Sequence, residues 1–153
     1  MRKRLSILVF AMLVGRAVAG DGGPIDTVKA LAALDAIEDQ VRIFDTTPTP
    51  LMRKYFSASF NQVWTTAMKH NKDFPVFDAD PLTGTQGGGG IKSLSAEIAG
   101  PNRVVSTMQL QHGPDQTIEF RMLHTPTGEW LINDIVYVRR GESLREVLGR
   151  ADR

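Results

Sequence analysis

Cysteine is absent from the 153-residue sequence. Its absence excludes disulfide bonds, zinc and iron–sulfur sites with thiolate ligands, and a cysteine nucleophile. It also excludes a bacterial lipoprotein anchor, which needs a cysteine at the cleavage point. A large excess of one charge is lacking too, because 18 Lys and Arg residues stand against 17 Asp and Glu residues. Nucleic acid is therefore not an expected partner, since proteins that bind it usually carry a clear basic surplus.

Motifs that define several enzyme classes are also missing. The sequence has no HExxH, no P-loop and no dinucleotide-binding fingerprint, and it lacks the Ser, His and Asp order of a catalytic triad. A phosphate-binding loop is not expected at the four glycines Gly87–Gly90. They are not followed directly by a Lys-Ser or Lys-Thr pair, and a strand rather than a helix is expected after them. We therefore predict neither a cofactor nor a metal ion.

Long apolar runs are lacking as well, except for Leu5–Gly15 at the N-terminus, which follows three cations at positions 2–4. Ala17 and Ala19 complete the pattern of a signal peptide, and we expect cleavage after Ala19. An apolar run of this length rises only ~16 Å as a helix, about half of a bilayer, so a stable membrane anchor is not expected. The pattern predicts residues 1–19 as a signal peptide and 20–153 as one periplasmic or secreted domain. Cleavage would leave 14 of the 18 cations against 17 anions, a mildly acidic balance.

Apolar residues recur at helical spacing in the first part of the domain and alternate in the second part. Helices are expected over 24–44, 50–56 and 57–72, then a loop over 73–90. Strands are expected near 91–99, 103–112, 116–124 and 129–138, before a last helix over 142–148. Short connections favour antiparallel neighbours. The pattern predicts an α+β fold in which N-terminal helices pack on one face of a four-stranded antiparallel sheet, with a short C-terminal helix.

The turn formed by residues 126–128 sets the predicted register of the last two strands, because Gly128 suits the left-handed position of a three-residue hairpin loop. Counting outward from this turn predicts the pairs Thr125–Glu129, His124–Trp130, Met122–Ile132, Phe120–Asp134 and Ile118–Val136. In this register His124 and Asp134 lie on the apolar face of the sheet. A slip of one residue would move the whole last strand to the other face.

Several short motifs carry a family resemblance. The most specific is Asp78-x-Asp80-Pro81-Leu82-x-x-x-Gln86, and the supporting pieces are Tyr55-Phe56, Trp130-x-Ile132-x-Asp134-Ile135 and Ser143-Leu144. With the order of helices and sheet, these motifs resemble exported bacterial domains of the YbjP and YqhG type, within the nuclear transport factor 2-like superfamily. The resemblance covers roughly Val28–Leu148 and implies a cone-shaped roll and an exported location, but no particular activity. Family members often have an acidic residue after the glutamine, where this sequence has Gly87.

Asp78, Asp80 and Gln86 are candidate ligand-binding residues in the predicted loop. Divalent cations such as calcium prefer several oxygen ligands, and Thr83 and Thr85 would add hydroxyl oxygens. The spacing is not that of an EF-hand. The alternative is a turn, in which Asp side chains accept hydrogen bonds from nearby backbone amides. The sequence favours the turn.

Asp134 is the main catalytic candidate, because a carboxyl group in an apolar pocket can serve as a general base. Isomerases of the superfamily pair such an Asp with a Tyr, so the resemblance implies Tyr55 or Tyr137 as its partner. His124 is a further candidate partner. The alternative is a structural Asp134 that accepts hydrogen bonds from backbone amides, since an unpartnered buried carboxyl group is costly. His112 and His124 with an aspartate offer the donors of a metal site, whereas histidines at strand ends are commonly solvated.

Two classes of function are left open. The first, which the sequence favours, is a non-catalytic exported domain that binds an envelope protein, a peptide or a small ligand through the cone or the loop. Trp64, with Tyr55 and Phe56, would add an apolar patch to such binding. The alternative is a small-pocket isomerase or hydrolyase with Asp134 as general base. The resemblance also implies a homodimer through the outer face of the sheet.

Overall fold

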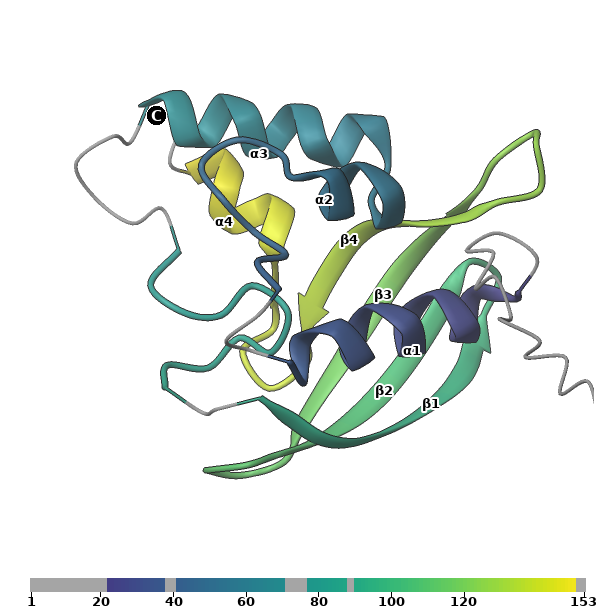
Figure 1. Ribbon diagram of the computed structural model, residues 1–153, viewed down its shortest axis with the longest axis vertical. Coiled ribbons are helices and arrows are strands. Elements are labelled where there is room, and N and C mark those ends of the chain that lie inside the picture. The colour runs from purple at the N-terminus through teal and green to yellow at the C-terminus, as the bar shows by residue number, and fades with distance from the viewer. Residues whose placement is uncertain (1–21, 38–40, 71–76, 88–89, 151–153) are drawn as a thin grey trace, which may run out of the picture.

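The computed structural model describes residues 22–37, 41–70, 77–87 and 90–150, so the predicted signal peptide lies outside the described residues. The fold is α+β, as predicted, with helices before an antiparallel sheet and a short helix after it (Figure 1). The elements are α1 (Pro24–Asp35), α2 (Pro50–Tyr55), α3 (Ala58–His70), β1 (Ile91–Gly100), β2 (Arg103–Leu110), β3 (Gln116–His124), β4 (Trp130–Tyr137), β5 (Glu142–Ser143) and α4 (Leu144–Arg150).

The sheet has five strands in the order β1-β2-β3-β4-β5, where four were predicted. The additional strand is β5, whose two residues pair with Val136 and Tyr137 of β4. A tight turn reverses the chain between them, with Gly141 in the left-handed region at φ 65°. Two residues cannot display an alternating pattern, so the sequence contains no signal for this strand.

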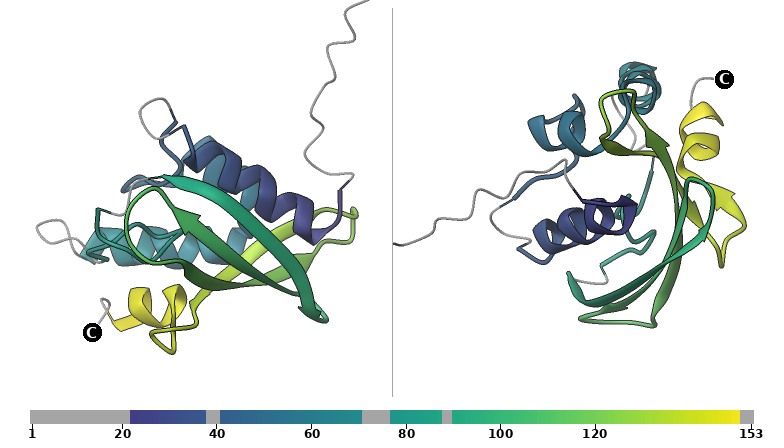
Figure 2. Two further views of the ribbon diagram at one scale, coloured as in Figure 1. Left: turned by 90° about the horizontal axis from the view of Figure 1, so that it is seen from below. Right: turned by 90° about the vertical axis from the view of Figure 1, so that its right-hand side faces the viewer.

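The sheet bends around α1, which lies across its concave side (Figure 2). The helices α2 and α3 lie next to β4, and α4 covers the opposite side of the sheet (Figures 1 and 2). Fully buried side chains from all of these elements form one core, including Leu31, Phe56, Phe60, Phe120, Ile132 and Leu148. Each such side chain contributes about 1.5–3 kcal/mol by leaving water, so this core holds the helices to the sheet.

The first helix is shorter than predicted, because α1 ends at Asp35 rather than at Phe44. Residues 41–45 are described and are not helical. Ile43 is buried there, and the Phe44 ring lies 5.6 Å from the ring of Phe56. The apolar spacing that suggested a longer helix therefore arises from an irregular segment that packs against the core. Residues 38–40 lie outside the described residues.

The pairing of β3 with β4 agrees with the prediction near the turn and departs from it further along the strands. The pairs that agree are Thr125–Glu129, His124–Trp130 and Met122–Ile132. The pairs that were predicted wrongly are Phe120–Asp134 and Ile118–Val136. In the structure Phe120 lies opposite Ile135, and Ile118 lies opposite Tyr137.

A β-bulge at Asn133 causes this departure. Asn133 has no partner on β3, so the register moves by one residue and Arg121 lies opposite Asp134. Side chains alternate between the two faces of a strand, and the extra residue therefore moves Asp134 to the side of the sheet that α4 covers. As a result, Ile135 occupies the core position opposite Phe120, and its side chain is fully buried. The bulge thereby keeps a carboxylate out of the apolar core, where it would be costly.

Candidate functional site

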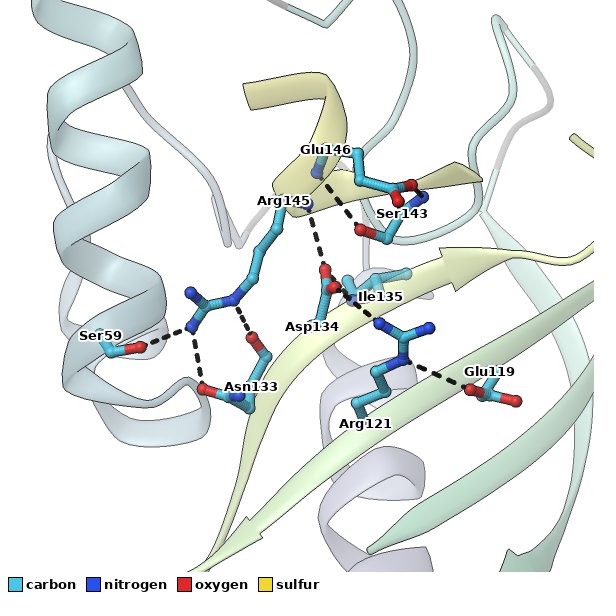
Figure 3. Close-up of polar contacts among 9 residues, drawn as sticks. All are labelled: Ser59, Glu119, Arg121, Asn133, Asp134, Ile135, Ser143, Arg145 and Glu146. Atoms are coloured by element: carbon cyan, nitrogen blue, oxygen red, sulfur yellow. Dashed lines mark hydrogen bonds and ion pairs between the residues drawn. The ribbon is translucent and has the colours of Figure 1, made fainter. Parts of the chain in front are cut away.

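Asp134 is buried, and its carboxylate binds backbone amides. Its Oδ1 atom accepts a hydrogen bond from the N–H of Ile135 at 2.9 Å and another from the N–H of Arg145, in the first turn of α4, at 3.1 Å (Figure 3). Its Oδ2 atom lies 3.7 Å from the guanidinium of Arg121. A carboxylate in this position satisfies two backbone donors and complements the positive end of a helix. These contacts support the structural alternative for Asp134.

The side chain of Arg145 connects this region to α3. Its Nε donates to the backbone carbonyl of Asn133 at 2.6 Å, and its Nη2 donates to Asn133 Oδ1 at 2.9 Å and to Ser59 Oγ at 2.6 Å (Figure 3). Its guanidinium also lies 5.8 Å from the ring of Phe60. The unpaired residue of the bulge thus becomes a docking point for both α3 and α4.

The helix α4 begins with a capping box. Ser143 Oγ accepts a hydrogen bond from the N–H of Glu146 at 3.2 Å, and Glu146 Oε2 accepts one from the N–H of Ser143 at 2.7 Å (Figure 3). This reciprocal pair satisfies two donors at the start of the helix. Together with Asp134, it accounts for the position of α4 without any ligand.

The predicted partners of Asp134 lie elsewhere. His124 and Tyr137 are on the core side of β3 and β4, because they follow the alternation of Phe120 and Ile135, whereas Asp134 faces the other way. Tyr55 is buried at the end of α2, with Lys54 Nζ 5.2 Å from its ring centre. Within the described ranges, Asp134 forms no hydrogen bond with Tyr55, Tyr137 or His124.

The two candidate histidines are also far apart. His112 lies in the turn before β3, and His124 is the last residue of β3, so the length of a nine-residue strand separates them, about 27 Å. The ring of His124 stacks on Trp130 at 4.4 Å. Within the described ranges, no group of three His, Cys, Asp or Glu side chains is arranged to hold a metal ion.

The loop over 77–87 is organised by Asp80. Its Oδ1 atom accepts hydrogen bonds from the N–H of Leu82 at 2.9 Å, the N–H of Thr83 at 2.7 Å and the hydroxyl of Thr83 at 3.1 Å. Its carbonyl accepts a further bond from the N–H of Gly84 at 2.7 Å. The turn interpretation of this motif is thus confirmed, and Asp80 Oδ1 is occupied by the backbone of its own loop.

The same loop packs on the ring of Tyr137. The Tyr137 hydroxyl donates to the carbonyl of Pro81 at 2.6 Å, and the Phe77 ring stacks on Tyr137 at 5.4 Å. Gly84 has φ 71°, and a Cβ atom at this position would lie 2.6 Å from the Tyr137 ring, so glycine is required both for the turn and for the contact. Burial raises the pKa of Tyr137, and the carboxylate of Asp80 raises it further, so the hydroxyl remains a donor.

A surface hollow of about 480 Å³ opens where this loop meets the end of β4, and we call it the loop hollow. Its lining residues are Phe77, Asp78, Ala79, Gly84, Thr85, Gln86 and Arg140. The guanidinium of Arg140 lies 5.6 Å from the ring centres of both Phe77 and Tyr137, and it is 2.8 Å from Glu142 Oε1. Gln86 Nε2 donates to the Asp78 carbonyl and to Asp78 Oδ2, both at 2.7 Å. The loop hollow thus combines an aromatic face, a guanidinium, a carboxylate and an amide.

The four candidate ligand-binding residues therefore have different positions. Asp78 and Gln86 line the loop hollow, and Asp80 supports it from within the loop. Trp64 is instead a core residue of α3, with 4% of its surface exposed and its Nε1 donating to the carbonyl of Asp45 at 2.7 Å. Its predicted role in an exposed apolar patch was wrong, because this face of α3 is covered.

Arg140 is the residue of the loop hollow that sequence reasoning missed. It appears in the sequence only as part of the pair Arg139-Arg140, which is typical of a solvated surface. Its partner Phe77 precedes it by more than sixty positions. No local spacing joins the two residues, so only the packing of the loop on Tyr137 reveals the site.

A scan against protein-family models, a search of curated proteins and a search of solved structures each found no match. Among the described residues, no helix is both long and apolar enough to cross a bilayer.

Proposed function

We propose that this protein is an exported, non-catalytic binding domain and that the loop hollow is its ligand site. The observation that carries the proposal is the convergence of Phe77, Asp78, Gln86 and Arg140 on one hollow, from segments far apart in the sequence. Export is supported by the cations, apolar run and small residues at the N-terminus. A cone-shaped roll of the nuclear transport factor 2-like kind is supported by the bent sheet around α1.

The chemistry of the loop hollow favours binding over catalysis. It presents donors and acceptors beside an aromatic face, which suits a polar peptide segment or a small polar ligand of the cell envelope. Arg140 is held in place by its two aromatic neighbours, by Glu142 and by the carbonyl of Gly84, so little conformational entropy is lost when it binds. Asp134, the residue expected to act as a base, faces α4 and is used by backbone amides instead.

The test is capture of binding partners from an envelope extract by the tagged protein, quantified by mass spectrometry, with a thermal-shift screen of small ligands beside it. The test variant is Arg140→Gln, which removes the charge from the loop hollow. The matched control is Arg139→Gln, because Arg139 is an exposed neighbour that does not line the loop hollow.

We expect a specific ligand to bind the original protein and Arg139→Gln within about twofold, and to bind Arg140→Gln at least about tenfold more weakly. A charge-assisted hydrogen bond is worth roughly 1.5–3 kcal/mol, which is enough for that difference. Equal binding by both variants would place the ligand site elsewhere. The absence of any specific partner or stabilising ligand would contradict the proposed function itself.

A further inference from the structure

A second surface hollow, of about 440 Å³, lies between α2 and α3 and shares no lining residue with the loop hollow. We call it the helix hollow. Polar and cationic side chains from both helices line it, namely Arg53, Asn61, Gln62, Thr65, Thr66 and Lys69. No carboxylate is among the described residues that line it. Apart from Pro48 and Ala58, the side chains that line it are therefore hydrogen-bonding groups or positive charges.

The absence of acidic residues extends along the whole of this segment. No Asp or Glu occurs in the sequence between Asp45 and Asp73, although the full chain contains 17. Arg53, Lys54 and Lys69 lie within that stretch. Opposite charges are mixed over the outer face of the sheet, where Arg103 and Arg121 both lie close to Glu119. The helix hollow is thus a local concentration of positive charge without internal neutralisation.

The frame of the helix hollow is fixed by hydrogen bonds. Asn61 Nδ2 contacts three carbonyl oxygens of the preceding segment, those of Met52, Phe56 and Ser57, at 3.2–3.3 Å. The hydroxyl of Thr65 donates to the carbonyl of Asn61 at 2.8 Å. Arg53 Nη1 donates to the carbonyl of Pro48, which positions the guanidinium and leaves its other N–H groups available. The ammonium group of Lys69 makes no hydrogen bond or ion pair within the described part of the chain.

We propose that the helix hollow binds a phosphate group. A tetrahedral phosphate accepts several hydrogen bonds at once, and its charge matches a site with two cations and no carboxylate. The guanidinium of Arg53 offers a planar set of donors, and Lys69 offers a mobile point charge. The amide of Gln62 and the hydroxyl of Thr66 supply neutral donors beside them. This site is separate from the loop hollow and does not depend on what that hollow binds.

Two sources of such a group, free phosphate and a lipid headgroup, are distinguished by two probes. Inorganic phosphate is titrated into the purified protein at constant ionic strength, so that general screening does not change, and backbone amides are followed by NMR. Vesicles of phosphatidylglycerol, with phosphatidylcholine vesicles as the neutral comparison, are tested by co-sedimentation. The variants are Lys69→Gln and the double variant Arg53→Gln/Lys69→Gln. Lys92→Gln, at an exposed position of β1, is the matched control.

We expect saturable shifts at Thr65, Thr66 and Lys69, or binding to the anionic vesicles alone, and either result supports the site and identifies the source. The affinity should fall at least about threefold in Lys69→Gln and about tenfold in the double variant, and stay within about twofold in Lys92→Gln. If Arg53→Gln impairs folding, Lys69→Gln alone decides, because the exposed side chain of Lys69 makes no hydrogen bond or ion pair in the described part of the chain. No saturable binding of either probe, or equal losses in Lys69→Gln and Lys92→Gln, overturns the proposal.

Discussion

The contacts of Asp134 predict that Asp134→Ala will lower the free energy of unfolding by about 2–6 kcal/mol. Its Oδ1 atom is the acceptor for the N–H groups of Ile135 and Arg145, and the change leaves both donors without an acceptor. Each unsatisfied buried donor costs about 1–3 kcal/mol. The pair with Arg121 adds little, because Arg121 is 55% exposed and its guanidinium is 3.7 Å away. The loss would be a large share of the stability of a small domain, roughly 5–15 kcal/mol.

The variant Asp134→Asn keeps an oxygen that accepts hydrogen bonds but removes the negative charge, so it tests the two contributions separately. The amide oxygen can still accept both hydrogen bonds, so the loss should be about 1–2 kcal/mol, the difference between charged and neutral acceptors. Urea unfolding followed by circular dichroism measures both variants. Glu119→Gln is the control, since Glu119 forms ion pairs with exposed arginines and should cost less than about 1 kcal/mol. A loss below about 1 kcal/mol in Asp134→Ala, or equal losses in the Ala and Asn variants, would refute the reasoning.

Three further predictions concern the loop, Tyr137 and the bulge. Gly84→Ala should lower the unfolding midpoint in urea more than Gly87→Ala, because both positions have positive φ but only Gly84 would press a Cβ onto a ring; equal losses would contradict the contact. The raised pKa of Tyr137 predicts that stability falls as the pH rises above 10.0, its ordinary value, because the unfolded chain then releases a proton that the folded chain keeps. In Tyr137→Phe, the free energy of unfolding measured by urea titration should decrease less steeply with pH in this alkaline range. An unchanged pH dependence in the variant would show that Tyr137 is not the cause. Arg145→Lys should cost about 1–2 kcal/mol in the same assay, since one ammonium cannot reproduce the forked contacts to Asn133; no loss would show that charge alone suffices.

Features that depend on neighbouring residues could be predicted from the sequence. The helix expected over 50–56 is present as α2, and it has a typical start: Pro50 is its first residue, and the hydroxyl of Thr49 accepts a hydrogen bond from the N–H of Met52 at 3.1 Å. Asp80 indicated a turn, and its bonds reach only two or three residues along the chain. In both cases the residues that determine the local structure are no more than three positions apart in the sequence.

Features that depend on distant residues could not be predicted in this way. In β4 the polar pair Asn133-Asp134 stands between apolar residues, and this pattern alone does not show that Asn133 lacks a partner on β3. The cost of burying Asp134 in the core and the contacts of Arg145 favour the bulge. The loop hollow is a similar case, because Phe77 and Arg140 meet only when the loop has packed on Tyr137. The sequence therefore indicated the loop whose residues Asp78 and Gln86 line the loop hollow, and it indicated the wrong face of the sheet for Asp134.

The position of α4 also has a consequence for the order in which the protein matures. Arg145 binds Ser59, which is synthesised 86 residues earlier, and its backbone N–H completes the bonding of Asp134. In a chain whose α4 has not yet been made or translocated, the outer side of the sheet is uncovered. Closure of the outer side therefore waits for α4, which follows all the other described elements in the chain. A C-terminal fusion that leaves 144–150 free to dock is compatible with this order, whereas an arrest or truncation before Leu144 would leave Asp134 without the N–H of Arg145.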